Sequence, residues 1–229
     1  MLLFFIDELV PLFIYIANFI QCLFNLNLPI NMLYIWSKIY MKIAKCNIYL
    51  IDNSRNLYSC PTKRCLFLAN RRDMYDLVID TYLTDGSAMF VSPVMLMCAF
   101  PWQYICNFLA KHMLPVNDIL PVNDRLPVND NIYTALSNTA YRHLIIYPEE
   151  VRPQDSSLKP IHTDAIQLAW TYHMCIQILI TKRNAGLDTF FSLQGVNFYC
   201  YRSEVINPKY FSSFEEFNTY VCLLWESHI

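Results

Sequence analysis

The sequence predicts an α/β fold: a single domain with a mixed, largely parallel central sheet flanked by helices, preceded by an N-terminal membrane-associated helical segment. Three observations lead to this prediction. Short apolar runs alternate with segments of helical periodicity, which favours strands joined by helical crossovers. Two of these runs end abruptly in charged turns, FLANRRDMYD at residues 67–76 and IIYPEEVR at residues 145–152. The first 23 residues are mostly apolar.

The chain is predicted to divide into a membrane-anchoring or interfacial helical segment, residues 1–45, and an α/β domain, residues 46–229. Asp7 and Glu8 interrupt the first apolar stretch, so its uninterrupted part is shorter than the ~20 residues that a spanning helix needs. Such a segment either spans the bilayer with tilt, dips into one leaflet or packs as a core helix. It lacks the basic start and the small-residue cleavage site of a secretory signal.

Residues 30–45 are predicted to form a helix that lies at the membrane interface. Lys38, Lys42 and Lys45 have a spacing that puts them on one helical face. Aromatic residues of the kind that settle at headgroup level accompany them, as at Trp36. A basic amphipathic helix beside an apolar anchor favours attraction to anionic lipid. The alternative is an ordinary surface helix with a solvated lysine stripe.

The remaining elements follow from periodicity and from turn residues. Asn70 or Asp73 is expected near the amino end of the first domain helix, where capping and acidic groups are favoured. Ser213 and Glu216 form a capping-box pattern at the start of the last helix. Strands are predicted at 47–51, 64–69, 89–91, 143–147, 176–181, 190–193 and 197–201, and helices at 72–83, 131–140, 163–173 and 214–226.

Two segments between these elements are unusual. Residues 86–110 carry no charge, but Pro93 and Pro101 lie within them, which argues against one straight membrane span and for a strand followed by a kinked helix. Residues 114–131 hold three tandem hexapeptides, LPVNDI, LPVNDR and LPVNDN. Because each unit is rich in turn residues, we expect a local duplication that lengthens a loop.

Composition narrows the class of protein. The formal net charge is −2 over 229 residues, so no nucleic-acid partner is expected. Hydrophobic residues make up 55% and charged residues 16%, against about 25% charged in soluble domains, which predicts apolar surface facing lipid. The nine cysteines show neither a C-x-x-C pair nor metal-ligand spacing, so we expect no metal and reduced thiols in the cytosol.

The charged turn after the first buried strand resembles a known block. Asn70, Arg71 and Asp76 are similar to the N-H-x-x-x-x-D block of the glycerolipid acyltransferases, the lysophosphatidic acid acyltransferase or PlsC-like family, with Arg71 in place of the histidine. VNDR at residues 122–125 resembles the middle block of that family, which ends in an arginine. The resemblance covers roughly residues 45–225.

The turn after residue 147 resembles the F-P-E-G-T-R block of the same family. It has the sequence YPEEVR, in which Glu150 and Val151 replace glycine and threonine. Glu149 and Arg152 then occupy the acidic and basic positions of the block. The resemblance implies that Arg152 and Arg125 bind the phosphate of a glycerolipid, for which a planar guanidinium fork is well suited.

The resemblance also implies the reaction. In the family, the histidine removes a proton from the acceptor hydroxyl, the aspartate orients it, and the hydroxyl attacks the thioester of acyl-CoA, which is a substrate and not a cofactor. Asp76 is present, but Arg71 is a donor only and does not act as a base. His112 is the nearest histidine to the site in sequence and is the alternative base.

The sequence therefore predicts a membrane-associated homologue that moves an acyl group from acyl-CoA to a lysophospholipid such as lysophosphatidic acid. The alternative is an inactive homologue that binds lipid or acyl-CoA as a membrane scaffold or regulator. A third possibility is an unrelated structural membrane protein. The expected location is the endoplasmic reticulum or another intracellular membrane, on its cytosolic face.

Overall fold

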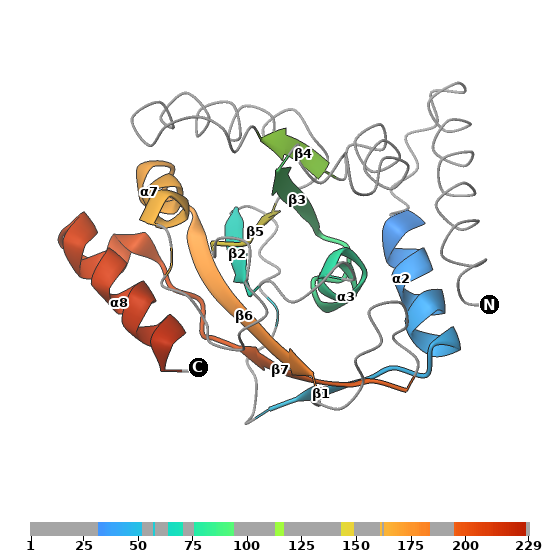
Figure 1. Cartoon of the computed structure of the whole chain (residues 1–229). Helices are drawn as coiled ribbons and strands as arrows, with labels where there is room; N and C mark the ends of the chain where they lie inside the picture. The colour runs from blue at the N-terminus through green and yellow to red at the C-terminus, as the bar shows by residue number, and fades with distance from the viewer. Residues whose placement is uncertain are drawn as a thin grey trace, which may run out of the picture.

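A computed structural model describes residues 32–51, 57, 64–70, 76–93, 113–116, 143–148, 161, 163–183 and 195–227. Within them, one sheet has helices on both of its faces (Figure 1). The helices α2 and α3 lie on one side of the sheet, and α7 and α8 lie on the other. Their bounds are α2 Met32–Ile43, α3 Asp76–Leu83, α7 Thr163–Thr171 and α8 Phe214–Glu226.

The sheet in the described part of the chain has seven strands in the order β1-β7-β6-β2-β5-β3-β4. Neighbouring strands run parallel except for β6 and β7, which are antiparallel. This confirms the predicted mixed, largely parallel sheet flanked by helices. The strand bounds are β1 Asn47–Leu50, β2 Cys65–Ala69, β3 Ala88–Pro93, β4 Met113–Val116, β5 His143–Ile146, β6 Cys175–Arg183 and β7 Asn197–Arg202.

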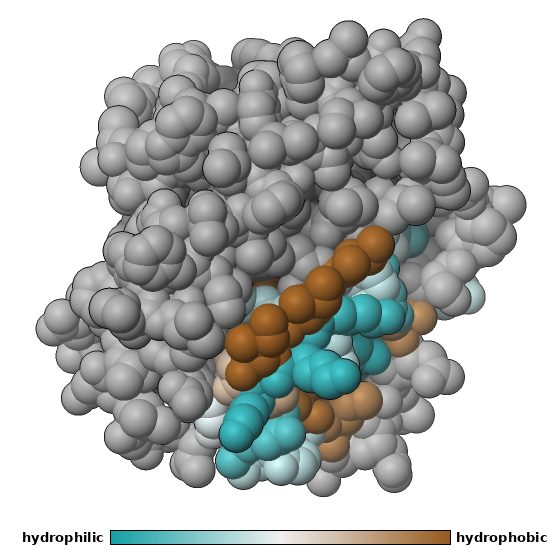
Figure 2. Space-filling view, turned by 90° about the vertical axis from the view of Figure 1, so that its right-hand side faces the viewer, coloured by the Kyte–Doolittle hydropathy of each residue, from teal (hydrophilic) through white to brown (hydrophobic). Residues whose placement is uncertain are grey.

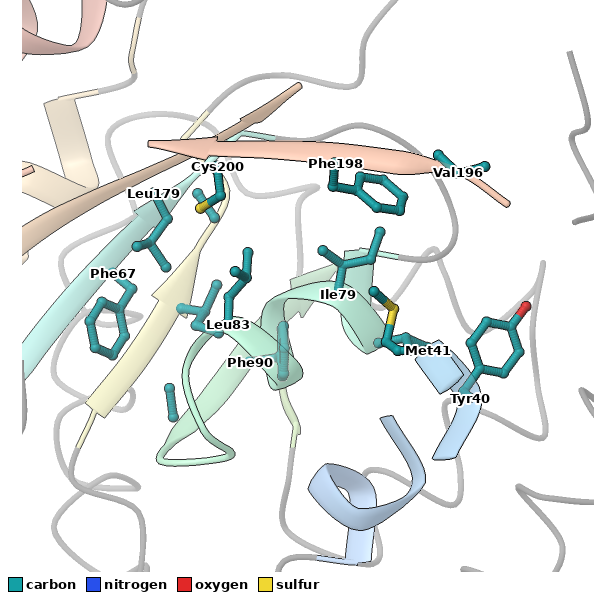
Figure 3. Close-up of a cluster of buried hydrophobic side chains, with 14 of the residues drawn as sticks. Tyr40, Met41, Phe67, Ile79, Leu83, Phe90, Leu179, Val196, Phe198 and Cys200 are labelled. Atoms are coloured by element: carbon teal, nitrogen blue, oxygen red, sulfur yellow. The ribbon is translucent and has the colours of Figure 1, made fainter. Parts of the chain in front are cut away.

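Strand β2 lies at the centre of the core, and all five of its residues are buried. Its side chains alternate between the two faces, as strand geometry requires. Phe67 belongs to the cluster that includes residues of α2 and α3, whereas Leu66 and Leu68 belong to the cluster that includes residues of α7 and α8. Figure 3 shows the first cluster, in which Phe198 of β7 and Ile79 of α3 are among the labelled side chains. A strand that is buried on both faces explains the continuous apolar run in the sequence.

The last helix begins and ends where the sequence predicts, and its capping box forms in part. The Ser213 hydroxyl accepts a hydrogen bond from the Glu216 amide at 3.3 Å. The Glu216 carboxylate accepts from the backbone amide and hydroxyl of Ser212, at 2.9 and 2.7 Å, and not from the amide of Ser213. These hydrogen bonds from Ser212 lower the pKa of Glu216. The box therefore closes one residue earlier than the pattern predicts.

The helix predicted over residues 30–45 is α2, and its carboxyl end is closed by backbone hydrogen bonds. Lys45 adopts the left-handed conformation, with φ of 53°. The Cys46 amide donates to Met41 O at 2.9 Å and the Lys45 amide to Lys42 O at 3.2 Å, which is a Schellman motif. The Gly195 amide donates to Ala44 O at 2.7 Å, so the end of α2 is tied to the turn that precedes β7.

Several predicted elements lie outside the described residues: the apolar segment 1–31, the kinked helix after β3, the helix 131–140 and the strand 190–193. None of the helices that the structure describes is long and apolar enough to cross a membrane. The membrane association of the N-terminal segment therefore stays a prediction.

The tandem repeat differs from the predicted loop, because its first copy contributes to a strand. β4 pairs with β3 at the edge of the sheet, with Pro115 opposite Ser92 and Val116 opposite Pro93. An edge strand tolerates proline, since its missing amide need not enter the ladder. The repeat is six residues long, an even number, so each copy would present its side chains to the same faces of the sheet.

Removing one hexapeptide is therefore expected to leave the fold intact. Deletion of residues 114–119 joins Met113 to the second copy and restores the β4 sequence MLPV. Because loop length has a weak effect on stability, the melting temperature followed by circular dichroism should change by less than about 3 °C. Deletion of residues 114–131 removes every copy and should lower it by about 10 °C. A single-copy deletion that melts as low as the triple deletion would contradict the assignment of β4.

Candidate functional site

The two charged turns leave neighbouring strands at the same edge of the sheet. β2 and β5 are parallel, with Leu68 paired with Ile146. Asn70 and Pro148 each lie two residues beyond this pair, so both turns begin side by side. In open α/β sheets, ligands bind in the crevice beyond the carboxyl ends of the strands. The sequence predicts a charged turn after each of these two strands, and the register of β2 and β5 brings the starts of the two turns together.

Asn70 fixes the point at which the first turn begins. Its side chain is 3% exposed and forms two hydrogen bonds with the backbone of β6. The side-chain amide donates to Thr181 O at 3.0 Å, and the Thr181 amide donates to the side-chain oxygen at 2.8 Å. The Asn70 amide also donates to Leu179 O at 3.3 Å. The side chain of Asn70 thus extends the sheet ladder by one step.

This contact corrects one expectation from the sequence. Asn70 was a candidate cap for the helix that follows, but both of its side-chain groups are used by Thr181. The physical reason is burial: an amide side chain that is removed from water must pair both its donor and its acceptor. Asp73, the other candidate cap, lies outside the described residues.

The second turn is tied to helix α3. Tyr147 is the first residue after β5, and its hydroxyl donates to the Asp80 carboxylate at 2.9 Å. Asp80 is 0% exposed, and the Tyr147 ring stacks on Phe90 at 6.5 Å between centroids. Asp80 lies four residues, about one helical turn, after Asp76 in α3. The pair therefore joins the start of the YPEEVR turn to the helix whose first residue is Asp76.

The carboxyl end of α3 is also anchored. The Arg202 guanidinium on β7 donates to Leu83 O at 2.9 Å, and the Thr84 hydroxyl donates to Asp80 O at 2.7 Å. Carbonyls in the last turn of a helix have no partner within the helix. Because β7 and α3 are held in this way, the amino end of α3 has a fixed position relative to the sheet.

Some of the predicted site residues lie within the described residues and others do not. Asp76 is the first residue of α3, next to the turn that leaves β2. Arg71, Arg125, Glu149 and Arg152 lie outside the described residues, and so does His112. The structure thus brings together the strand ends from which Arg71 and Glu149 continue, and it does not test the phosphate contacts assigned to Arg125 and Arg152.

Sequence reasoning missed the residues that hold the site in place. Asp80 was the available signal, because an acid in the apolar sequence DLVIDTYL needs a partner when it is buried. Tyr147 in the phenylalanine position of its block was the second signal. The sequence alone does not show that Tyr147 and Asp80 are partners, because their contact depends on the position of β5 in the sheet.

In the described part of the chain, the thiol of β2 is unreactive and no metal cluster is present. Cys65 is the first residue of β2, and burial raises its pKa well above the ordinary thiol value, with neighbouring Cys175 adding to the shift. A thiol of this kind is inert at neutral pH. Among the described residues, no three histidine, cysteine, aspartate or glutamate side chains are grouped so as to hold a metal ion.

Comparison with known proteins identifies the fold. No family model and no curated protein matches the sequence. Among solved structures, the chain is similar to the crystal structure of the 1-acyl-sn-glycerophosphate (LPA) acyltransferase, PlsC, from Thermotoga maritima, with a TM-score of 0.61 and 15% identity. The likeness covers 96% of this chain and 89% of that chain. At this identity it shows the fold, and at that level it confirms the resemblance predicted from the sequence blocks.

The contact between Asn70 and Thr181 predicts a large loss of stability on truncation. Asn70→Ala leaves two buried backbone groups of Thr181 without their partner, which should lower the free energy of unfolding by about 3 kcal/mol. Urea denaturation measures the loss. Asn47→Ala is the matched control, because Asn47 donates to Asn197 at 3.1 Å on the exposed surface, and it should cost about 0.5 kcal/mol or less. Equal losses in the two variants would contradict the role given to Asn70.

Proposed function

We propose that this chain is a membrane-associated glycerolipid acyltransferase homologue. Its site would bind a lysophospholipid such as lysophosphatidic acid together with acyl-CoA. The observation that carries the proposal is the pairing of β2 with β5, which starts both charged turns side by side. Asp76 is the first residue of α3, the helix that follows β2 in the chain. The fold shared with an LPA acyltransferase supports the same substrate class.

Acyl transfer at this edge would need residues that hold the acceptor phosphate, acidic partner residues and a base. The acceptor hydroxyl attacks the thioester carbonyl, so that a carbon–oxygen bond forms, the carbon–sulfur bond breaks and CoA leaves as the thiol. Arg125 and Arg152 would hold the acceptor phosphate, because guanidinium binds phosphate through two parallel hydrogen bonds. Glu149 and Asp76 are the acidic partners in this proposal. A base must also take the proton of the hydroxyl.

Arg71 stands where that base would be, and this favours a second candidate function. A guanidinium stays protonated at every physiological pH and has no lone pair for a proton. Without another base, the same site would bind lysophospholipid or acyl-CoA without turning it over, as a membrane scaffold or regulator. His112 is the one other candidate base that the sequence offers near the site.

The proposed location is the cytosolic face of the endoplasmic reticulum or of another intracellular membrane. In the described part of the chain, Cys65 and Cys222 are free thiols. Free thiols are common in a reducing compartment. The apolar composition and the apolar first 23 residues support contact with lipid.

Release of CoA from acyl-CoA in the presence of lysophosphatidic acid tests the proposal. Arg71→His is expected to raise the rate by about 10²–10⁴-fold, because it supplies a general base. Asp76→Asn in the Arg71→His background should remove most of this gain. Substantial release by the unchanged chain would show that another base acts, and His112→Gln would then reduce it. If neither form releases CoA but both bind the lipid, the scaffold function holds. If neither form binds it, both functions are wrong.

Two deletions test whether Arg125 contacts phosphate. Deletion of residues 114–119 and deletion of residues 120–125 leave the same β4 sequence, MLPV. After the first deletion, Arg125 follows the LPVND unit that is joined to Met113. After the second deletion, Ile119 follows that unit. An arginine–phosphate contact is worth about 1.5–3 kcal/mol, so the second variant should bind lysophosphatidic acid about 10- to 100-fold more weakly in a calorimetric titration. Equal affinity in the two variants would remove Arg125 from the site.

A further inference from the structure

Strand β6 continues past the end of its neighbour β2. The ladder between β2 and β6 ends where Ala69 pairs with Leu179, whereas β6 runs on to Arg183. Along its other side this extension pairs with β7, and β7 in turn pairs with β1. Figure 1 shows β6 running from α7 to the end where β7 and β1 lie. The extension therefore borders the edge of the sheet at which the two charged turns begin.

One face of this extension carries two exposed tyrosines. Tyr49 of β1 and Tyr199 of β7 are 48% and 38% exposed. They are partners in the ladder, and their rings stack with centroids 5.5 Å apart and planes at 23°. Lys182 of β6 is exposed and is the partner of Tyr199 on the other side. Because partners in a ladder point to the same face, these three side chains form one row across the strands.

Two asparagines lie beside this row. Asn47 and Asn197 come two residues before Tyr49 and Tyr199, so they point to the same face of the sheet. The side-chain amide of Asn47 donates to Asn197 Oδ1 at 3.1 Å. The surface thus combines aromatic rings, amides and a positive charge. It is called the tyrosine platform here, and its residues are Asn47, Tyr49, Lys182, Asn197 and Tyr199.

The described helices on this side of the sheet, α7 and α8, cover β6 as far as Ile180. Ile178 and Ile180 are buried in the cluster that includes Phe217 of α8, whereas Lys182, the next residue on that face, is exposed. Figure 2 shows the side of the molecule on which α2 lies, where hydrophobic residues form a row beside hydrophilic ones. Since α2 lies on the opposite side of the sheet, that row is not part of the tyrosine platform.

We propose that the tyrosine platform binds the adenine nucleotide end of acyl-CoA. The adenine ring stacks on the exposed tyrosines, as bases stack on aromatic side chains in other proteins. Lys182 contacts a phosphate of the nucleotide, and the asparagines contact the base, because a side-chain amide matches the donor and the acceptor on the edge of adenine. The inference rests on the proposed function, in which acyl-CoA is the donor. It places the donor nucleotide on residues outside the two charged turns.

The tyrosine platform is close to the start of the first charged turn. Thr181, which bonds to Asn70 at the beginning of that turn, directly precedes Lys182. Neighbouring strands are about 4.8 Å apart, so Tyr199 and Tyr49 lie about 5 and 10 Å from β6 across the sheet. The pantetheine arm of acyl-CoA joins the nucleotide to the thioester and spans a distance of this order. A nucleotide on the platform therefore allows the thioester to lie at the edge of β2 and β5.

The chemistry of the tyrosine platform favours this occupant over two others. A strand of nucleic acid needs a positively charged groove along its backbone, whereas the platform includes one lysine and the whole chain has a formal net charge of −2. A second copy of the chain, packed symmetrically on the same surface, would bring the two Lys182 side chains close together, and like charges in an interface are costly. One nucleotide needs only a stacking surface and a cation beside it.

Calorimetric titration of the full chain with CoA tests the proposal. Tyr199→Leu removes the ring and Tyr199→Phe keeps it, while Tyr220→Leu removes a ring of α8 that is 47% exposed. Lys182→Gln is compared with Arg183→Gln, which removes the same charge from the next residue, on the other face of the sheet. A photoreactive CoA with an azido group on its adenine is also irradiated with the unchanged chain. Mass spectrometry of the labelled peptides then locates the base, whether or not each variant folds.

Tyr199→Leu should weaken CoA binding about tenfold, because stacking of one base on an aromatic ring contributes about that much. Tyr199→Phe and Tyr220→Leu should change it less than about twofold. Lys182→Gln should weaken it about three- to fivefold, as expected for an exposed ion pair, and Arg183→Gln should have a smaller effect. The photoreactive CoA should label β1 or β7.

Three results would overturn the proposal and leave acyl-CoA as the donor: normal binding by Tyr199→Leu, equal losses in Lys182→Gln and Arg183→Gln, or a label outside β1, β6 and β7. ATP that binds as tightly as CoA would assign the tyrosine platform to free adenine nucleotides instead. If the unchanged chain binds no CoA, both this inference and the donor of the proposed function are wrong. The CoA-release assay is not needed, so an inactive chain gives the same answer.

Discussion

The parallel pairing of β2 with β5 is the constraint on which the candidate site depends. β2 has neighbours on both sides and is buried on both faces, so its register cannot slip without moving core side chains into the wrong cluster. That register starts both charged turns at one edge. The hydrogen bonds of Asn70 with Thr181 then carry the ladder one residue past the strand. The turn after β2 thus starts from a residue that is buried and hydrogen-bonded to the neighbouring strand.

Much of the fold is predictable from the sequence, because strands and helices leave different periods in it. The buried runs of β2 and β6 are continuous and apolar, as strands covered on both faces must be. The helix Phe214–Glu226 has a serine cap and a sequence that buries one face. The strand β4 was missed, because Pro115 and the turn-forming repeat conceal a short strand that pairs with β3 at the edge of the described sheet.

The site is less predictable than the fold, since its supporting contacts join residues that are far apart in sequence. Tyr147 and Asp80 are 67 residues apart, and Arg202 and Leu83 are 119 apart. No local pattern encodes such pairs, and only the strand order makes them neighbours. The blocks that resemble a family show where chemistry would occur. The buried polar contacts behind them show how the chain around Asp76 keeps its position.

The even length of the hexapeptide has a consequence for inheritance as well as for folding. Tandem repeats gain or lose units when DNA is copied, and here a whole unit shifts the chain by an even number of residues, so the inward and outward faces of the edge strand are preserved. Such length changes would leave no trace in the core. They would change the loop length and the residue after the unit that follows Met113, which is Ile119, Arg125 or Asn131. A change in repeat number would therefore change the charge at this position of the chain without any point mutation.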